Sequence, residues 1–246
     1  MPTTGPQSRT SCPPVTAPPP TVAAAAAVPL YQLRCGQLDQ VVSDAGYHPI
    51  IGVDEAGRGP LFGPLVAAAV QLPDDLGALT GQLDDSKQLT AARREQLAVQ
   101  LHRQARVAVV SVAAADIDTV GIGVANRQAL AAAARQLLVD LPQTETPAVL
   151  VDGFQLEPAI GPAGAVATWQ IIKGDRRSVA VAAASIVAKT ARDAWVAAAA
   201  QRWPEYGFER HKGYGTAAHR LALEQLGPTA EHRRTFNPLA RMLSAG

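Results

Sequence analysis

The chain has 246 residues, of which 48% are hydrophobic and 17% are charged, which is ample apolar sequence for a packed core. The net charge of +1 excludes a polycation, although residues 173–246 carry 12 Lys and Arg against 6 Asp and Glu, while residues 1–172 carry 10 against 15. Two cysteines exclude a disulfide framework and no apolar run is long enough to span a bilayer, so we expect a cytoplasmic protein without a membrane segment.

The first residues of the chain differ in composition from the rest. Residues 1–28 are rich in proline, threonine, serine and alanine, and such a segment buries too little apolar surface to offset the entropy of ordering. We therefore predict a disordered leader there. Residues 29–47 are predicted to form a linker or a short helix. The folded domain is expected over 48–240, with a short tail at 241–246.

Apolar runs and helix-forming segments alternate through this domain. The glycine-rich turn between the first two apolar runs predicts a β-hairpin. Thr90 is a suitable N-cap for one helix, and Ser178 for another, while Gly227 suits a helix C-terminus. Strands are predicted at 50–54, 64–72, 106–114, 147–153 and 167–175, and helices at 89–105, 124–140, 178–203 and 216–227. This alternation is typical of an α/β domain.

Acidic residues stand at the ends of three predicted strands: Asp54 with Glu55, Asp152, and Asp175. Ligands of open α/β sheets bind beyond the strand C-termini, so these carboxylates are expected to meet there. Gathered carboxylates repel one another unless cations neutralise them, and Mg²⁺ and Mn²⁺ prefer oxygen ligands of this kind. Two such ions, roughly 4 Å apart, suit an in-line displacement at phosphorus.

Asp54 and Glu55 are neighbours, and adjacent side chains of a regular strand point to opposite faces. Both reach one site only if the strand ends or twists close by. Gly57 and Gly59 permit such a change of direction, because glycine accepts positive φ, and the resulting turn presents Arg58. The alternative interpretation is a plain hairpin with both acids exposed at its tip.

Several motifs in the chain resemble the ribonuclease HII family, the prokaryotic type 2 ribonucleases H. The motifs are GVDEAGRGPLFGPLVAAAV at 52–70, DDSKQL at 84–89, VDG at 151–153, KGDRRSVAVAAASIVAKTARD at 173–193, YGFERHKGYGT at 206–216 and HRRTFNP at 232–238. They occur in order over nearly the whole of 48–240. The resemblance implies a ribonuclease H-like fold, in which a mixed sheet is flanked by helices and followed by a helical C-terminal region.

The resemblance also implies an activity. Members of the family are metal-dependent endonucleases that cut the RNA strand of RNA–DNA hybrids and incise 5′ of single ribonucleotides in duplex DNA, leaving a 3′-hydroxyl and a 5′-phosphate. Such enzymes serve ribonucleotide removal and RNA primer removal. Carried over by motif, Asp54, Glu55, Asp152 and Asp175 form the catalytic site that holds Mn²⁺ or Mg²⁺.

Substrate binding is implied for a second set of residues: Gly57, Arg58, Gly59, Lys87 and Tyr214. The Gly-Arg-Gly turn matches the family motif that contacts the 2′-hydroxyl, the group that distinguishes RNA from DNA. Tyr214 matches a tyrosine that stacks on the sugar beside the ribonucleotide, and Lys87 matches a lysine near the phosphates. The chain departs from the family at Gly215, where proline is usual, and glycine loosens the loop that holds Tyr214.

Other charged residues of the C-terminal third have two possible roles. Lys189 and Arg192 lie on one predicted helix face, where they either meet a phosphate or, as we favour, pair with an acid inside the domain. His219 is expected on a helix surface. The basic balance of this third fits either nucleic-acid binding or a solvated helix face.

Three rival functions remain open from the sequence. A ribonuclease H restricted to long hybrids would result from weak sensing by Tyr214, and a non-catalytic hybrid-binding module would result from a decayed site. A different two-metal nuclease or strand transferase requires another arrangement of acids. The presence of all four acids favours the catalytic interpretation, and the absence of an apolar heptad pattern favours a monomer.

Overall fold

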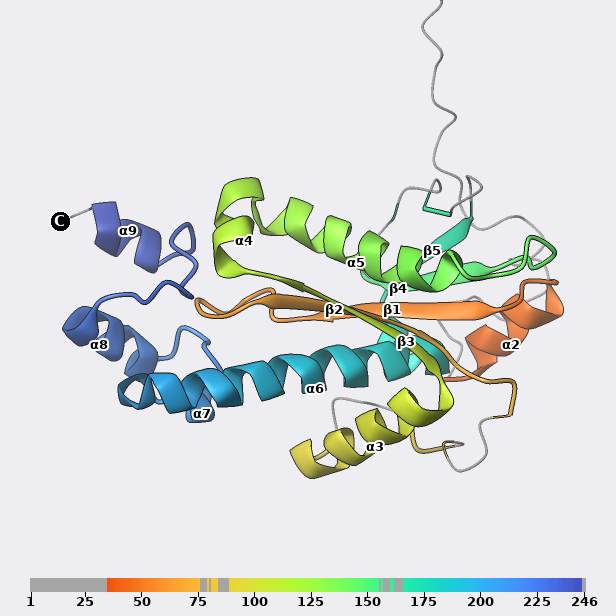
Figure 1. Ribbon diagram of the computed structural model, residues 1–246, viewed down its shortest axis with the longest axis horizontal. Helices are drawn as coiled ribbons and strands as arrows, with labels where there is room; N and C mark the ends of the chain where they lie inside the picture. Colours follow the sequence, from red (N-terminus) through yellow and green to blue (C-terminus); the bar gives the residue numbers. More distant parts are fainter. Residues whose placement is uncertain are drawn as a thin grey trace, which may run out of the picture.

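A mixed β-sheet forms the centre of the fold (Figure 1). The computed structural model describes residues 35–75, 79, 81–83, 89–154, 156, 160–161 and 166–244, so the predicted leader and Lys87 lie outside the described residues. The strands are β1 (Ile50–Ala56), β2 (Leu65–Gln71), β3 (Arg106–Val112), β4 (Ala148–Asp152) and β5 (Ala167–Ile171). Over the described residues, these five strands lie in the order β3-β2-β1-β4-β5. The predicted hairpin is confirmed, because β1 pairs antiparallel with β2, while β1, β4 and β5 are parallel.

Helices surround this sheet and continue beyond its end. They are α2 (Gln37–Asp44), α3 (Ala91–Gln104), α4 (Ala114–Val120), α5 (Ile122–Leu138), α6 (Val179–Arg202), α7 (Phe208–His211), α8 (Ala217–Leu226) and α9 (Leu239–Ser244), with 3-10 turns at Gly174–Arg176 (η3) and Pro204–Tyr206 (η4). Two predicted caps are confirmed: the side chain of Thr90 accepts from the backbone nitrogen of Arg93, and that of Ser178 accepts from that of Val181. No helix in the described part of the chain is long and apolar enough to cross a membrane.

The two faces of the sheet are covered by different helices. Figure 1 shows α5 on one side and α6, with α3 outside it, on the other. The pleat of β2 divides its side chains accordingly: Ala67 and Ala69 belong to the core beneath α5, whereas Ala68 and Val70 belong to the core that includes α3 and α6. The fold is therefore the predicted mixed sheet flanked by helices.

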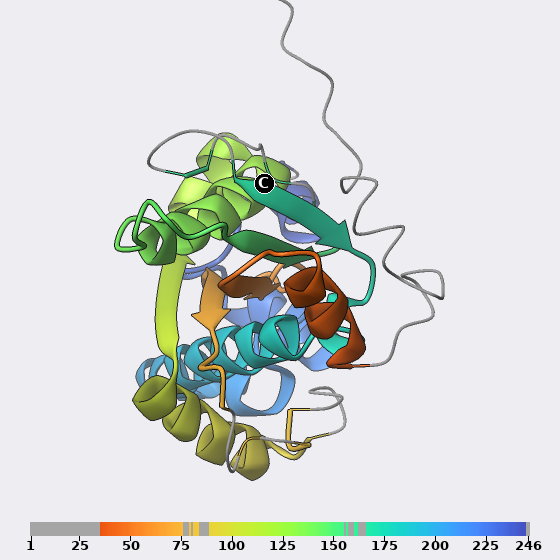
Figure 2. The same ribbon diagram turned by 90° about the vertical axis from the view of Figure 1, so that its right-hand side faces the viewer.

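Helix α6 lies directly on the backbone of β1. A Cβ atom at Gly52 would stand 2.0 Å from the backbone carbon of Ala180, so only glycine allows this approach. The first turn of α6 is also held by α2, because Asp39 accepts hydrogen bonds from the hydroxyl of Ser178 at 2.8 Å and from the backbone nitrogen of Val179 at 2.9 Å. Figure 2 shows α2 beside this end of α6.

Most predicted element boundaries differ from the structure by one or two residues, and two differences matter for the fold. The strand expected to run to residue 175 ends at Ile171, because Lys173 takes a left-handed conformation with φ 57° and the chain then enters η3. The helix expected at 124–140 begins two residues earlier and follows a separate helix, α4, that the sequence pattern did not reveal. Gly121, with φ 80°, separates the two helices.

Aromatic side chains hold the C-terminal helices to the turn between β1 and β2. Phe62, which is fully buried, stacks on Phe208 at a centroid distance of 3.7 Å. Leu223 of α8 and Leu239 of α9 belong to the same buried cluster. The C-terminal region is thus packed against the glycine-rich turn, which positions it near the end of β1.

Candidate active site

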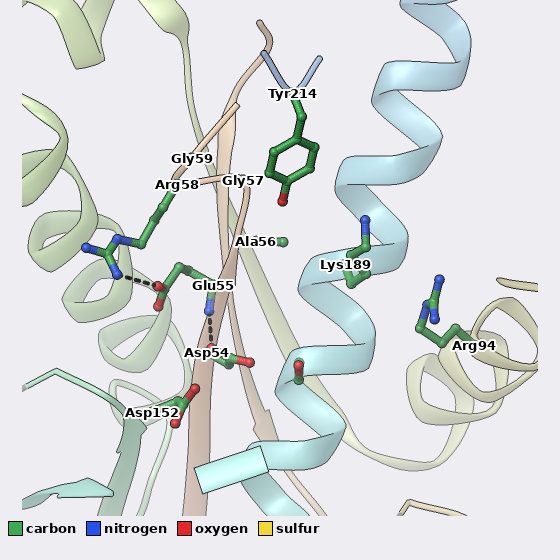
Figure 3. Close-up of a pocket in the computed structure, with 11 residues that line it drawn as sticks. Asp54, Glu55, Ala56, Gly57, Arg58, Gly59, Arg94, Asp152, Lys189 and Tyr214 are labelled. Carbon is green, nitrogen blue, oxygen red and sulfur yellow. Dashed lines mark hydrogen bonds and ion pairs between the residues drawn. The ribbon is translucent and has the colours of Figure 1, made fainter. Parts of the chain in front are cut away.

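A cavity of about 430 Å³ lies at the end of β1, where the parallel strands also end. Figure 3 shows the side chains that surround it. Its lining consists of Asp54, Glu55, Ala56, Gly57, Arg58, Gly59, Arg94, Asp152, Ser185, Lys189 and Tyr214. Parallel strands bring their carboxyl ends to one edge of a sheet, which is why acids far apart in sequence meet here.

Asp54 and Glu55 leave the strand in different directions but line the same cavity. Asp54 lies on the side of α6, where the hydroxyl of Ser185 forms a hydrogen bond with it, and its Oδ1 accepts from the backbone nitrogen of Glu55 at 2.7 Å. Glu55 lies on the side of α5, near the buried amide of Asn126. The pleat is therefore regular, and the cavity extends around the end of the strand, which stops one residue later at Ala56.

Burial makes the ionised forms of both carboxyl groups unfavourable. The pKa of Asp54 is raised well above its ordinary value, chiefly by burial and then by the negative charges of Asp152 and Glu55. Burial also raises the pKa of Glu55, to about 7, although the positive charge of Arg58 partly offsets it. A bound cation would favour the ionised forms of these carboxyl groups and so stabilise the site.

Asp152 and Asp175 lie at the same edge of the sheet but in different surroundings. Asp152 ends β4 and lines the cavity, and its Oδ1 accepts from the backbone nitrogen of Gly174 at 2.7 Å. Asp175 is fully buried in η3 and is not part of the cavity lining. The structure therefore brings Asp54, Glu55 and Asp152 together around one cavity. Asp175 is outside the lining, one residue after the Gly174 whose nitrogen donates to Asp152.

The donor set fits a hard divalent cation in its chemistry. Three carboxylates, whose oxygens are potential metal ligands, line the cavity. Two of them have raised pKa values that a cation would lower. Among the residues that the structure describes, no three Asp, Glu, His or Cys side chains converge closely enough to hold a metal ion by themselves. Mg²⁺ is commonly held by one or two carboxylates together with water and substrate phosphates, so the set is compatible with metal binding that the substrate completes.

The Gly57–Gly59 turn carries Arg58 to the rim of the cavity. Gly57 has φ 93°, and a Cβ atom there would lie 2.2 Å from Nε of Arg192, so the turn requires glycine both for its conformation and for space. The guanidinium of Arg58 lies 3.7 Å from Oε1 of Glu55 and 4.4 Å from the ring centre of Phe154. About half of the Arg58 side chain remains exposed, available to a ligand.

Tyr214 stands on the other side of this turn. Its Cε1 atom would be 3.7 Å from a Cβ atom at Gly59, and Figure 3 shows its hydroxyl directed into the cavity. Tyr214 is 47% exposed. Beneath it, Arg192 is buried and donates to the backbone oxygens of Phe62 and Lys212, so it fastens the Tyr214 loop to the β1–β2 turn. The expected ion pair of Arg192 with an acid is not found among the described residues, and backbone carbonyls take that place.

Lys189 has the acid partner that was expected for it. Its Nζ lies 2.6 Å from Oδ1 of Asp193, one helical turn away, and the side chain still lines the cavity. Sequence reasoning did not single out Arg94, which reaches the cavity from α3. The paired arginines at 93 and 94 on a predicted helix were the available signal. Lys87 lies outside the described residues, so its predicted role stays a prediction.

The prediction that His219 lies on a helix surface is wrong. His219 is fully buried, because α8 packs the face that carries His219, Ala222 and Leu223 against the aromatic cluster. The spacing of these three residues was the signal for an inward face. His232 is also buried, and Nε2 atoms of the two rings lie 3.0 Å apart.

Comparison with known proteins identifies relatives of this chain. The family model described as ribonuclease HII matches residues 51–240. A ribonuclease HII of Rhizobium leguminosarum bv. trifolii is 44% identical over 206 residues, which is 84% of this chain and 85% of the relative. The crystal structure of ribonuclease H2 from Pyrococcus horikoshii OT3 matches with a TM-score of 0.66 and 26% identity over 80% of this chain and 97% of that one. Bst-RNase HIII in complex with Mn²⁺ shares the fold, with a TM-score of 0.59 and 19% identity over 80% and 70% of the two chains.

Proposed function

Because this chain belongs to the ribonuclease HII family, and is thus a divalent-metal-dependent ribonuclease H endonuclease acting on RNA–DNA hybrids, we propose that it also incises duplex DNA on the 5′ side of single embedded ribonucleotides. The products would be a 3′-hydroxyl and a 5′-phosphate, and the reaction would serve ribonucleotide and primer removal in the cytoplasm. One observation carries this proposal: the Gly57–Gly59 turn and Tyr214 lie side by side at the rim of the cavity that Asp54, Glu55 and Asp152 line.

This arrangement supports recognition of one ribose next to the reacting phosphate. The exposed backbone of Gly59 permits close approach of a sugar, and Arg58 offers a planar donor with half of its side chain exposed. Tyr214 presents an aromatic ring suited to stacking on the neighbouring deoxyribose. A 2′-hydroxyl held between these groups would place the adjoining phosphate over the carboxylates.

Asp54, Glu55, Asp152 and Asp175 are proposed to hold the metal, Mn²⁺ or Mg²⁺. The bound cations would activate water and neutralise charge on the reacting phosphate. Ser185 would orient Asp54 through its hydrogen bond, and Lys189 and Arg94 would face the phosphate backbone from α6 and α3. Because Asp175 is buried outside the cavity lining, a small rearrangement would bring it to the metal.

The test uses duplex DNA that carries one ribonucleotide, labelled at the 5′ end of that strand, beside an all-RNA strand paired with DNA. Each is incubated with the full chain and Mn²⁺ or Mg²⁺. We expect a cut on the 5′ side of the lone ribonucleotide, and Asp54→Asn should abolish it while keeping hybrid binding, because asparagine retains the shape and the hydrogen bond to Glu55. Exposed Asp140→Asn serves as the matched control.

A second candidate is a ribonuclease H restricted to long hybrids. Gly215 favours it, since a glycine gives the Tyr214 loop no rigidity of its own. Cleavage of the all-RNA strand without cleavage at the single ribonucleotide would establish this alternative.

We also propose that the enzyme works as a monomer, and light scattering of the full chain at working concentration tests that.

A further inference from the structure

Two buried histidines link Tyr214 to the segment that follows α8. His219 and His232 are 0% and 1% exposed, and their Nε2 atoms lie 3.0 Å apart. At one end, Nδ1 of His219 lies 3.0 Å from the backbone oxygen of Tyr214. At the other end, Nδ1 of His232 lies 3.0 Å from the backbone nitrogen of Thr229. The two rings therefore form a continuous path between two stretches of backbone.

The ends of this path fix the positions of its hydrogens. A carbonyl oxygen only accepts, so Nδ1 of His219 must carry a hydrogen, and Nε2 of the neutral ring then accepts. A backbone nitrogen only donates, so Nδ1 of His232 accepts from Thr229 and its Nε2 carries the hydrogen. The hydroxyl of Thr229 also lies 2.9 Å from this Nδ1; it accepts from the nitrogen of Glu231 and donates its own hydrogen to the ring. Both ends independently require a single hydrogen between the rings, directed from His232 to His219.

Burial keeps both rings in this neutral state. It lowers the pKa of His219 to about 4 and that of His232 to about 3; in addition, His211 lowers the pKa of His219, and His219 lowers that of His232. A second proton on either ring would set two N–H groups face to face, either between the Nε2 atoms or against Thr229. The directed arrangement has no equivalent alternative.

The far end of the path belongs to the segment that holds the Gly57–Gly59 turn. Two residues beyond Thr229, the backbone oxygen of Glu231 accepts from the nitrogen of Gly63 at 2.9 Å. Two residues further, Arg233 is fully buried and donates to the backbone oxygens of Arg58 and Gly63, both at 3.0 Å. The histidines thus connect the loop of Tyr214 to the segment 229–233, which holds the backbone of Arg58 and Gly63.

We propose that His219 and His232 are positioning residues that set Tyr214 against the Gly57–Gly59 turn through this directed hydrogen-bond path. The proposal rests on the proposed role of Tyr214 in sensing the ribonucleotide. Gly215 follows Tyr214 and gives the loop no stiffness of its own. The carbonyl oxygen of Tyr214 accepts from the nitrogen of Thr216 within the loop, at 2.8 Å, and is tied to α8 by the side chain of His219.

The first test is spectroscopic and needs no substrate or metal. Long-range ¹H–¹⁵N correlation of the full chain distinguishes the two neutral forms of each imidazole. We expect the hydrogen on Nδ1 in His219 and on Nε2 in His232, with assignment from His219→Asn and His232→Asn spectra. Any other pair of neutral forms, or a charged ring at pH 7, would overturn the proposal.

The second test separates positioning from stability. His219→Leu removes the bond to Tyr214, His219→Asn keeps a donor near the place of Nδ1, and Leu223→Ala weakens the same helix without touching the path. Binding is measured by fluorescence anisotropy in EDTA, with duplex DNA that has or lacks one ribonucleotide. We expect His219→Leu to lose roughly tenfold in the preference for the ribonucleotide, which corresponds to about one buried hydrogen bond. The other two variants should keep the preference.

The outcomes distinguish failure of this proposal from failure of the proposed function. Tyr214→Ala is measured alongside. If it loses the preference and His219→Leu keeps it, only the positioning role is refuted. If Tyr214→Ala itself keeps the preference, the sensing role of Tyr214 fails, and the positioning role fails with it. Equal losses in His219→Leu and Leu223→Ala would also overturn the proposal, because they would reduce the histidines to a contribution to stability.

Discussion

Replacing Glu55 with glutamine should make the metal-free protein more stable while removing its activity. The pKa of Glu55 is about 7 instead of its ordinary 4.5, mainly because of burial, and its side chain is only 10% exposed. A shift of this size corresponds to about 3 kcal/mol. Between pH 4.5 and 7 the folded protein keeps a proton that the unfolded chain releases, so stability falls as the pH rises through this window and stays lower above it.

Glutamine is neutral at every pH, so the variant avoids this loss. At pH 8 in EDTA we expect Glu55→Gln to gain up to about 3 kcal/mol, or roughly 6–12 °C in the unfolding midpoint for a domain of this size. At pH 5 the gain should shrink to about 1 kcal/mol or less. Differential scanning calorimetry at both pH values measures this, with exposed Glu95→Gln as the control. A variant no more stable than the parent at pH 8 would refute the conclusion that the buried carboxylate is strained.

Three further outcomes follow from the same geometry. Gly57→Ala should lower stability in urea and abolish cleavage, because its Cβ atom would meet Arg192 at 2.2 Å, whereas Gly81→Ala, which also has positive φ but nothing within 4 Å, should cost only the backbone strain of about 1–2 kcal/mol. Equal costs in the two variants would contradict the steric argument. Adding Mn²⁺ at pH 7 should raise the midpoint of thermal unfolding and release protons, and both effects should be smaller in Glu55→Gln. Calorimetry that detects no proton release would oppose a metal site at these carboxyl groups. Stability should fall as the pH drops from 6.5 toward 4, by up to roughly 1.4 kcal/mol per pH unit for each buried histidine, because only the unfolded chain protonates these rings in that range. If His232→Leu leaves the slope of stability against pH unchanged, His232 does not contribute.

The order of strands and helices was predictable because it depends on local patterns. Thr90 and Ser178 cap the helices that they were expected to cap, and the glycine-rich turn joins the expected hairpin. The meeting of Asp54 with Asp152 followed from their places at strand ends, once the strands were taken as parallel. These features need only sequence spacing and the rules of sheet topology.

What the sequence did not reveal depends on contacts between distant segments. The spacing of His219, Ala222 and Leu223 indicates an inward face of the helix, but the partner of that face, Phe208 beside His219, cannot be identified from the spacing. Arg192 was expected to pair with an acid, but its guanidinium donates to the backbone oxygens of Phe62, 130 residues away, and of Lys212, 20 residues away. The depth of Asp175, outside the cavity, results from the early end of β5, which the apolar pattern did not mark.

The bond between Asp39 and the first turn of α6 also has a consequence for synthesis of the protein. Asp39 and Val179 are 140 positions apart. At the usual rates of translation, roughly 5–20 residues per second, α2 waits roughly 7–28 s on the ribosome before its partner is made. During that time β1 lacks α6, whose backbone later touches Gly52. The nascent chain therefore exposes one apolar face of its central strand, which makes it a candidate client for chaperones until the last third emerges.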